Sequence, residues 1–348
     1  MKKRIISLAA AAVFVIGTLA GCGNSSTQTT DKTASSDASS SGGDLVTVRD
    51  AVMTGQLDQY ATEIGLWQGI FEKYGIDLQT TEFVAGINTI DAVVNGAADI
   101  GMMADYAAVN RLGNTLDATN LQIFSQISGG QSALSGGLYV DPKYADDPKS
   151  LDGSAGFMYQ EGTVTYYYAS KCIEYLGLDE SKQNLINTDS SQTRLALIQK
   201  GGASAVYANG SEAKYIEEAG WVQVATSQEI GIQTGSYFLS TDKYISENTD
   251  TLAKFLQAVD ESTQYINDHL DESAEYLADK LGLKAEDFKE NWKNYSFEPG
   301  FSEEATAHLE DIEKWGFEHG SFPKDYNVRD FINTDVAKIA FPDNVNIE

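Results

Sequence analysis

The chain has 348 residues, with 51 acidic and 24 basic side chains and a formal net charge of −27 at pH 7. This charge argues against binding to nucleic acid, or to an anionic lipid surface through a basic face. The length allows a large core and indicates two domains.

The first residues are typical of an export signal. Residues 2–4 are cationic, residues 5–20 are apolar, and residues 19–22 read Leu-Ala-Gly-Cys. Such an order predicts a signal peptide over residues 1–21. The apolar run is shorter than the ~20 residues that a membrane-spanning helix needs. The last four residues resemble the bacterial lipobox, which implies a lipid on Cys22; a plain secretory signal with a chance cysteine is the alternative.

A tether follows the predicted cleavage point. Residues 22–43 consist almost wholly of small and polar residues, so nothing offsets the entropy of ordering them. We therefore expect a disordered, flexible segment after the lipidated Cys22. The protein is then exported and held by its lipid at the outer face of the cell membrane. The other cysteine, Cys172, is expected to be a small buried hydrophobe.

From residue 45 the chain alternates predicted strands and helices. Short apolar or alternating runs mark the strands, and apolar residues at helical spacing mark the helices. The first part is predicted to contain strands at residues 45–53, 76–78, 98–103 and 121–124, with helices at 60–74 and 86–95. This order indicates parallel strands joined by crossover helices.

The middle of the chain repeats the pattern, and residues 196–206 resemble residues 92–100 as a helix, a glycine stop and a strand. This similarity suggests two α/β halves. Further strands are predicted at residues 137–140, 155–159, 203–207 and 237–240, and helices at 164–176, 195–199, 211–215, 252–269, 273–281, 285–292 and 303–319.

Four short motifs carry a family resemblance: residues 63–78 (EIGLWQGIFEKYGIDL), 95–101 (NGAADIG), 150–153 (SLDG) and 162–163 (GT). In this order they resemble the solute-binding proteins of ABC importers for nitrate, sulfonates, taurine and thiamine-precursor pyrimidines, the SsuA/THI5-like and NMT1-like group. The chain departs from the group's pattern at Ser204, where the group has an acid, and at Glu161.

The resemblance implies an α/β, two-lobed type II periplasmic-binding-protein fold. Each lobe would hold a mixed, mostly parallel sheet flanked by helices, with a helical C-terminal region. Lobe 1 is expected at residues 44–129 and 237–348, and lobe 2 at residues 130–236. The two crossings between the lobes would form a hinge.

The implied function is that of a monomeric, lipid-anchored solute-binding component of an ABC importer, which delivers its small-molecule ligand to permease subunits in the membrane. Neither a cofactor nor a metal site is expected. In open α/β sheets, ligands bind beyond the carboxyl ends of the strands. The ligand-binding residues expected there are Gln56, Asp58, Gly86, Asp105, Tyr106, Gln131, Glu161, Gly162, Thr163, Thr165, Tyr207 and Asn209.

The charges in these loops indicate the charge of the ligand that they would bind. The loops contain Asp58, Asp105 and Glu161 but neither Lys nor Arg. Carboxylates beside aromatic rings favour a neutral or cationic N-heterocycle or amine, such as a thiamine-precursor pyrimidine. A sulfonate, taurine, nitrate or bicarbonate is the alternative, if Arg111 or Arg194 folds inward or if a helix N-terminus holds the anion.

Catalytic interpretations have less support. All three histidines, His269, His308 and His319, lie in the C-terminal region, away from the expected cleft. A pyrimidine synthase of the same fold relies on a cluster of cysteines that this chain lacks. A purely structural surface lipoprotein would explain Cys22 but not the two-lobed pattern. We therefore expect a binding protein and not an enzyme.

Overall fold

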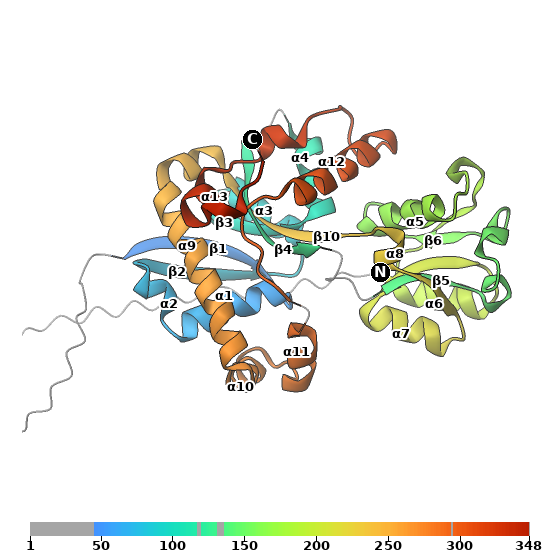
Figure 1. Ribbon diagram of the computed structural model, residues 1–348, viewed down its shortest axis with the longest axis horizontal. Helices are drawn as coiled ribbons and strands as arrows, with labels where there is room; N and C mark the ends of the chain where they lie inside the picture. Colours follow the sequence, from blue (N-terminus) through green and yellow to red (C-terminus); the bar gives the residue numbers. More distant parts are fainter. Residues whose placement is uncertain (1–44, 117–119, 131–135, 294, 348) are drawn as a thin grey trace, which may run out of the picture. The chain divides into compact units, whose positions relative to one another are not determined.

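The computed structural model describes residues 45–116, 120–130, 136–293 and 295–347. Residues 43–348 form one compact unit. Its described strands form two five-stranded sheets; Figure 1 labels the strands of the first sheet, β5 and β6 of the second, and the flanking helices.

The first sheet has the strand order β2-β1-β3-β10-β4. Parallel pairing joins β1 to β2 and to β3, whereas β10 runs antiparallel to both β3 and β4. Four strands therefore run in one direction and β10 runs against them. The strands are β1 (Val46–Met53), β2 (Ile76–Phe83), β3 (Ile100–Ala104), β4 (Leu121–Gly130) and β10 (Thr234–Thr241).

The second sheet has the order β7-β6-β8-β5-β9, and β5 is its reversed strand. The two sheets thus share one pattern, in which β6, β7, β8, β5 and β9 take the places of β1, β2, β3, β10 and β4. This pattern confirms the expected fold class of two mixed, mostly parallel sheets. The strands are β5 (Gly136–Val140), β6 (Phe157–Tyr159), β7 (Leu185–Asn187), β8 (Ala205–Asn209) and β9 (Val222–Thr226).

Helices cover both faces of the first sheet because its strands carry apolar residues on both sides. Val48 and Val52 of β1 pack with α1 and α9, whereas Ala51 between them packs with α3 and α4. The helices of this half are α1 (Leu57–Trp67), α2 (Ile70–Lys73), α3 (Gly86–Val94), α4 (Asp105–Thr115), α9 (Asp242–Asp268), α10 (Leu270–Leu281), α11 (Ala285–Trp292), α12 (Glu303–Glu318) and α13 (Asp335–Ala340).

The second sheet is covered in the same way. One face packs with α5 and α8 and the other with α6 and α7, and Cys172 of α5 is fully buried and free, as predicted. These helices are α5 (Val164–Tyr175), α6 (Ser191–Gln199), α7 (Gly210–Glu218) and α8 (Ser227–Ile230). In the described residues the 3-10 turns are η2 (Pro142–Tyr144), η3 (Pro148–Leu151), η4 (Glu180–Lys182), η5 (Val328–Phe331) and η6 (Pro342–Asn344).

The structure corrects three predictions of local structure. The helix predicted over residues 60–74 is broken into α1 and α2, because Gly69 takes a left-handed conformation (φ 66°) between them. The strand predicted at residues 121–124 continues to Gly130 as β4, which pairs with β10. The edge strands β7 and β9 were not predicted.

The ends of β4 and β10 nearest to the second sheet pair with each other. Gly129 is the partner of Gly235, and Ser128 is the partner of Ser236. A Cβ atom added to Gly129 would lie 3.1 Å from the carbonyl oxygen of Thr234 in β10, so the close approach of the two strands leaves little room for a side chain there. The two crossings expected to form the hinge therefore make one antiparallel ribbon.

In the part of the chain that the structure describes, we find no helix with the length and apolar character that crossing a membrane requires.

Candidate functional site

The strand registers bring the expected site residues of the first sheet to one edge. Met53 at the end of β1 pairs with Phe83 at the end of β2, and Ala104 at the end of β3 pairs with Ser236. Helices α1, α3 and α4 begin at this edge. It therefore carries the expected residues Gln56, Asp58, Gly86, Asp105 and Tyr106.

The second sheet has an equivalent edge, where β6 and β8 end side by side. Glu161, Gly162, Thr163 and Thr165 follow β6, and Asn209 ends β8. We call these two edges the strand-end edges. The expected ligand residue Gln131 and the expected lipidation site Cys22 lie outside the described residues.

Asp58, in the first turn of α1, joins this helix to the ribbon of the two crossings. Ser236 Oγ donates to Asp58 Oδ2 at 2.6 Å and lies 2.7 Å from Ser128 Oγ. Because the Ser236 hydroxyl hydrogen is used by Asp58, Ser128 must donate to Ser236. Burial raises the pKa of Asp58, while the hydrogen bond from Ser236 opposes that rise. Asp58 thus binds the ribbon of β4 and β10, and it is not an exposed charge.

Asp105 makes a second buried connection at the first residue of α4. Its Oδ2 accepts from the backbone N–H of Gly235 at 2.9 Å and contacts Nε2 of His308 at 2.7 Å. Its Oδ1 accepts from the N–H of Tyr106 at 2.6 Å. The expectation that all three histidines lie away from these residues is therefore wrong for His308, because α12 packs against α4.

The acids of the second sheet are also engaged. Arg194, buried on α6, donates from Nε to Glu212 Oε1 at 2.6 Å and from Nη2 to Oε2 at 3.1 Å. This bidentate pair neutralises Glu212 at the start of α7. Asn187 donates to the exposed carboxylate of Glu161 at 3.1 Å. The other arginine considered, Arg111, pairs with Asp91 at 2.7 Å on the first sheet's helices.

Thr163 and Thr165 form a hydroxyl network where α5 begins. The Thr163 hydroxyl accepts from the N–H of Thr165 as the N-cap and lies 2.8 Å from the Thr165 hydroxyl. Thr163 donates to the carbonyl of Gln160, whose N–H donates to Thr165. Both hydroxyls are half-buried and fixed in place.

Tyr207 lies two residues before the end of β8 and is buried. Its hydroxyl is 2.9 Å from Ser227 Oγ, and burial raises the pKa of this tyrosine to about 12. Tyr106 is likewise buried, with its ring 6.1 Å from that of Trp315. Both tyrosine rings therefore belong to the hydrophobic core next to the strand-end edges.

The start of α3 differs from every other α-helix in the described residues. It has neither a side-chain cap nor an acidic residue in its first turn, and its first residue is Gly86. The first amide groups of a helix lack intrahelical partners and carry partial positive charge. Two exposed apolar side chains, Val84 at 86% and Ile87 at 41% exposure, stand beside these amides.

Sequence reasoning missed Ser128, Ser236 and His308 as partners of the site acids. Ser128 and Ser236 lie at the two predicted crossings, and this position could have indicated that they lie close to the site acids. For His308 no sequence signal pointed to Asp105. Among the described residues, no group of three His, Cys, Asp or Glu side chains is arranged to hold a metal ion.

Comparison with known proteins agrees with this architecture. At 17% identity, the periplasmic aliphatic sulphonate binding protein SsuA from Escherichia coli matches with a TM-score of 0.68 over 83% of this chain and 92% of its own. The alkanesulfonate-binding protein SsuA from Xanthomonas axonopodis pv. citri, bound to MOPS, matches at 14% identity and a TM-score of 0.62, over 84% and 99% of the chains.

The periplasmic nitrate-binding protein NrtA from Synechocystis PCC 6803 matches at 15% identity and a TM-score of 0.59, over 85% of this chain and 89% of its own. Curated protein sequences yield no match. The sequence profile described as NMT1/THI5 like matches residues 64–273, more than half of the 348 residues. The chain therefore belongs to the NMT1/THI5-like family.

Proposed function

We propose that the protein is the solute-binding component of an ABC importer and that it captures a small organic anion of the sulfonate class between its two strand-end edges. Family membership and the two matched sheets support a binding role. The sheets also support lobes at residues 44–129 with 237–348 and at 130–236. A catalytic role has less support, because among the described residues no Ser, Thr or Cys side chain hydrogen-bonds to His308.

The state of the acids favours an anion over a cation. The sequence suggested a neutral or cationic ligand because the loops contain acids without Lys or Arg. Asp58 and Asp105 instead bind the hinge ribbon, and Glu212 is paired with Arg194. Of the acids considered, only Glu161 is exposed. Apart from Glu161, the charges that would attract a cation are therefore already used within the protein.

The start of α3 is the feature that favours a sulfonate as the ligand. The N–H groups of Gly86 and Ile87, in a first turn without a side-chain cap or an acidic residue, suit a sulfonate oxygen. The exposed Val84 and Ile87 offer apolar contact for an alkyl chain attached to that headgroup. Nitrate would use the amides but leave these side chains in water. An alkanesulfonate matches both features.

A thermal-shift panel tests this proposal. Ligand at about 100 times its dissociation constant should stabilise the protein by roughly 2.7 kcal/mol, which is visible as a raised melting temperature. We expect alkanesulfonates and taurine to raise it, and nitrate, pyrimidines and polyamines to do so less. If pyrimidines or amines alone stabilise the protein, the proposed ligand class is wrong.

A matched pair of variants on α3 locates the site. Ile87→Glu places a carboxylate beside the amides that would bind the sulfonate, so we expect alkanesulfonate affinity to fall about tenfold or more, through repulsion and competition. Val94→Glu makes the same change at the other end of α3, on a side chain of similar exposure (39%), and should leave affinity unchanged. Calorimetry measures both; equal affinities would place the ligand elsewhere.

Lipid attachment at Cys22 completes the proposed role, because a tethered binder stays close to the permease subunits it serves. When expressed in a bacterial host, the Cys22→Ala protein should move from the membrane to the soluble or secreted fraction. Fractionation followed by immunoblotting measures this. A Cys172→Ala variant is the control and should stay with the membrane, as Cys172 is buried in α5.

A further inference from the structure

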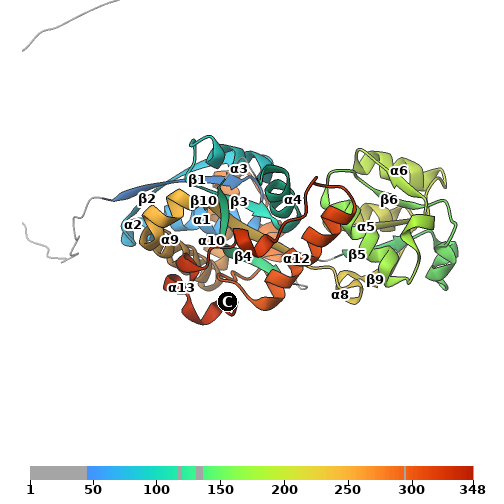
Figure 2. The same cartoon turned by 90° about the horizontal axis from the view of Figure 1, so that it is seen from above.

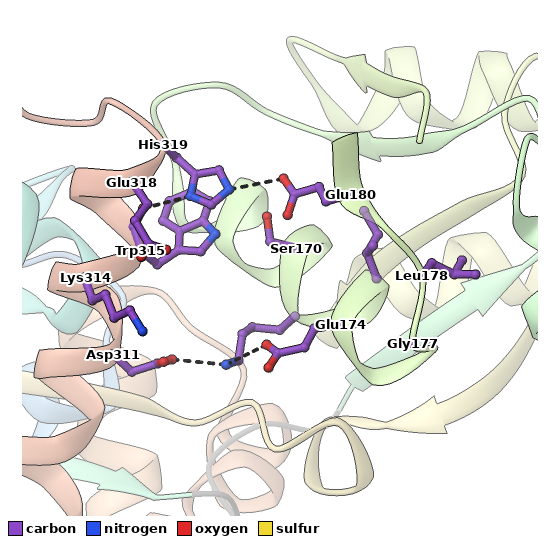
Figure 3. A pocket seen from close by; sticks show the side chains of 12 residues that line it. Ser170, Glu174, Gly177, Leu178, Glu180, Asp311, Lys314, Trp315, Glu318 and His319 are labelled. Carbon is purple, nitrogen blue, oxygen red and sulfur yellow. Dashed lines mark hydrogen bonds and ion pairs between the residues drawn. The ribbon is translucent and has the colours of Figure 1, made fainter. Parts of the chain in front are cut away.

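A groove between α5 and α12 forms a cavity of about 550 Å³ (Figure 3). It is separate from the strand-end edges, because on α5 its lining starts at Ser170, six residues into the helix. The two helices belong to different sheets, and both views of the fold show α12 extending to α5 (Figures 1 and 2). Any molecule held in the groove would thus contact both halves of the protein.

Most charged groups of the groove already have partners. Lys171 Nζ lies 3.1 Å from both Asp311 Oδ2 and Glu174 Oε2. Glu180 Oε1 lies 3.3 Å from Nε2 of His319, as Figure 3 shows. These contacts join α5 and the turn after it to α12, and because Lys171 faces two carboxylates the lining keeps an excess of acid.

Two buried donors in the groove have no partner. Ser170 is 5% exposed and Trp315 is 8% exposed, and neither Ser170 Oγ nor Trp315 Nε1 has a hydrogen-bond partner among the described residues. Figure 3 shows the indole nitrogen of Trp315 turned towards α5, on the side of Ser170. Buried polar groups are normally paired, so this pair of donors calls for an acceptor. Both atoms are covered, so an acceptor reaches them only after side chains of the groove rearrange.

Two opposite charges at the rim of the groove also stand without an ion-pair partner in the described part of the chain. Lys314 and Glu318 are exposed and lie one turn apart on α12, on either side of Trp315. The groove therefore offers the donors of Ser170 and Trp315 together with the ammonium group of Lys314. One turn further along α12 it offers the unpaired carboxylate of Glu318.

We propose that this groove is a second binding site, for a zwitterionic α-amino acid. The ligand carboxylate accepts from Trp315 Nε1, Ser170 Oγ and Lys314, and its ammonium group meets Glu318. A simple anion would face a lining with four carboxylates against two lysines, and a simple amine would leave the donors unpaired. Only a molecule with both charges satisfies both parts of the groove.

Calorimetry of the whole protein with L-lysine as the probe tests the site. The second ammonium group of L-lysine suits the excess of acid in the lining. Cadaverine is L-lysine without the carboxylate. We expect L-lysine to bind, and cadaverine to bind at least tenfold more weakly because it offers no acceptor to Trp315 and Ser170.

Variants then place the probe. Trp315→Phe keeps an aromatic ring but removes the N–H, and Lys314→Glu reverses the rim charge; each should weaken L-lysine binding about tenfold or more. Lys254→Glu makes the same charge reversal at an exposed lysine of α9 and should have no effect on L-lysine binding. Ile87→Glu should also have no effect on it. Equal affinity for cadaverine, no binding of L-lysine, or loss of binding in Ile87→Glu but not in Lys314→Glu would each overturn the proposal. None of these results depends on whether sulfonates bind at the strand-end edges.

Discussion

Replacing Asp50 by Asn should make the protein more stable at neutral pH. Asp50 lies in β1 with 1% exposure, and neither carboxyl oxygen has a hydrogen-bond partner among the described residues. Burial raises the pKa of Asp50 to about 8. The folded protein therefore keeps the proton of this group between about pH 4 and pH 8, whereas the unfolded chain has lost it.

The sign of the pH effect follows from this difference in bound protons. Across the window from about pH 4 to pH 8, the native state binds one more proton than the unfolded state, so stability falls as pH rises. The full effect of a shift of ~4 pKa units is about 5 kcal/mol, present below pH 4 and lost by pH 8. Asn cannot ionise, so Asp50→Asn should be as stable as the parent near pH 4 and several kcal/mol more stable near pH 8 (~1.4 kcal/mol per pKa unit).

Urea unfolding at several pH values gives the free energy of unfolding and tests this prediction. Asp146→Asn is the matched control, because Asp146 is exposed and the change in formal charge is the same. We expect the control to follow the parent at every pH. If the curves of Asp50→Asn and the parent stay parallel from pH 4 to pH 8, the carboxyl of Asp50 does not hold its proton in the native state.

Replacing Asp105 by Ala should destabilise the protein by about 3 kcal/mol or more. The carboxylate joins the start of α4 to Gly235 in β10 and to His308 in α12, and all its contacts are buried. Removing one partner of a buried pair leaves the others without an acceptor, which typically costs about 3–5 kcal/mol. Because Gly235 belongs to the hinge ribbon, the affinity for the cleft ligand should fall as well.

An exposed pair on the same half of the protein serves as the control. Asp91 lies 2.7 Å from Arg111, but its side chain is 48% exposed, so Asp91→Ala should cost no more than roughly 1 kcal/mol. A double-mutant cycle of Asp105→Ala with His308→Ala isolates their coupling, for which we expect a clear non-zero energy. An Asp105→Ala protein that unfolds at the same urea concentration as Asp91→Ala would contradict the buried connection.

The elements predicted from sequence are those with strong periodic signals. The long C-terminal helices and the central strand β3 carry apolar residues at clear spacing, and they lie close to their expected positions. The missed strands β7 and β9 both lie at sheet edges. An edge strand buries few side chains, and Val222–Thr226 is mostly exposed, so its sequence lacks the usual signal.

The positions of the site residues were easier to predict than their chemistry. Loops that follow parallel strands meet at one edge whatever their sequence, so Asp58 and Asp105 were placed there correctly. The partner of Asp105, however, is His308, which is 203 residues away in sequence. Counting charges loop by loop cannot show which acids are already paired, and this is why a neutral or cationic ligand was expected.

The ribbon formed by the two crossings sets the order in which the two sheets can be completed as the chain emerges from its N-terminus to its C-terminus. All strands of the second sheet lie within Gly136–Thr226, so this sheet has its full set once residue 226 has emerged. The first sheet begins earlier in the chain, yet β4 has no neighbouring strand to pair with until β10 (Thr234–Thr241) is made. The half that emerges first is therefore completed last, and until β10 arrives β4 has no partner strand and presents an unpaired edge.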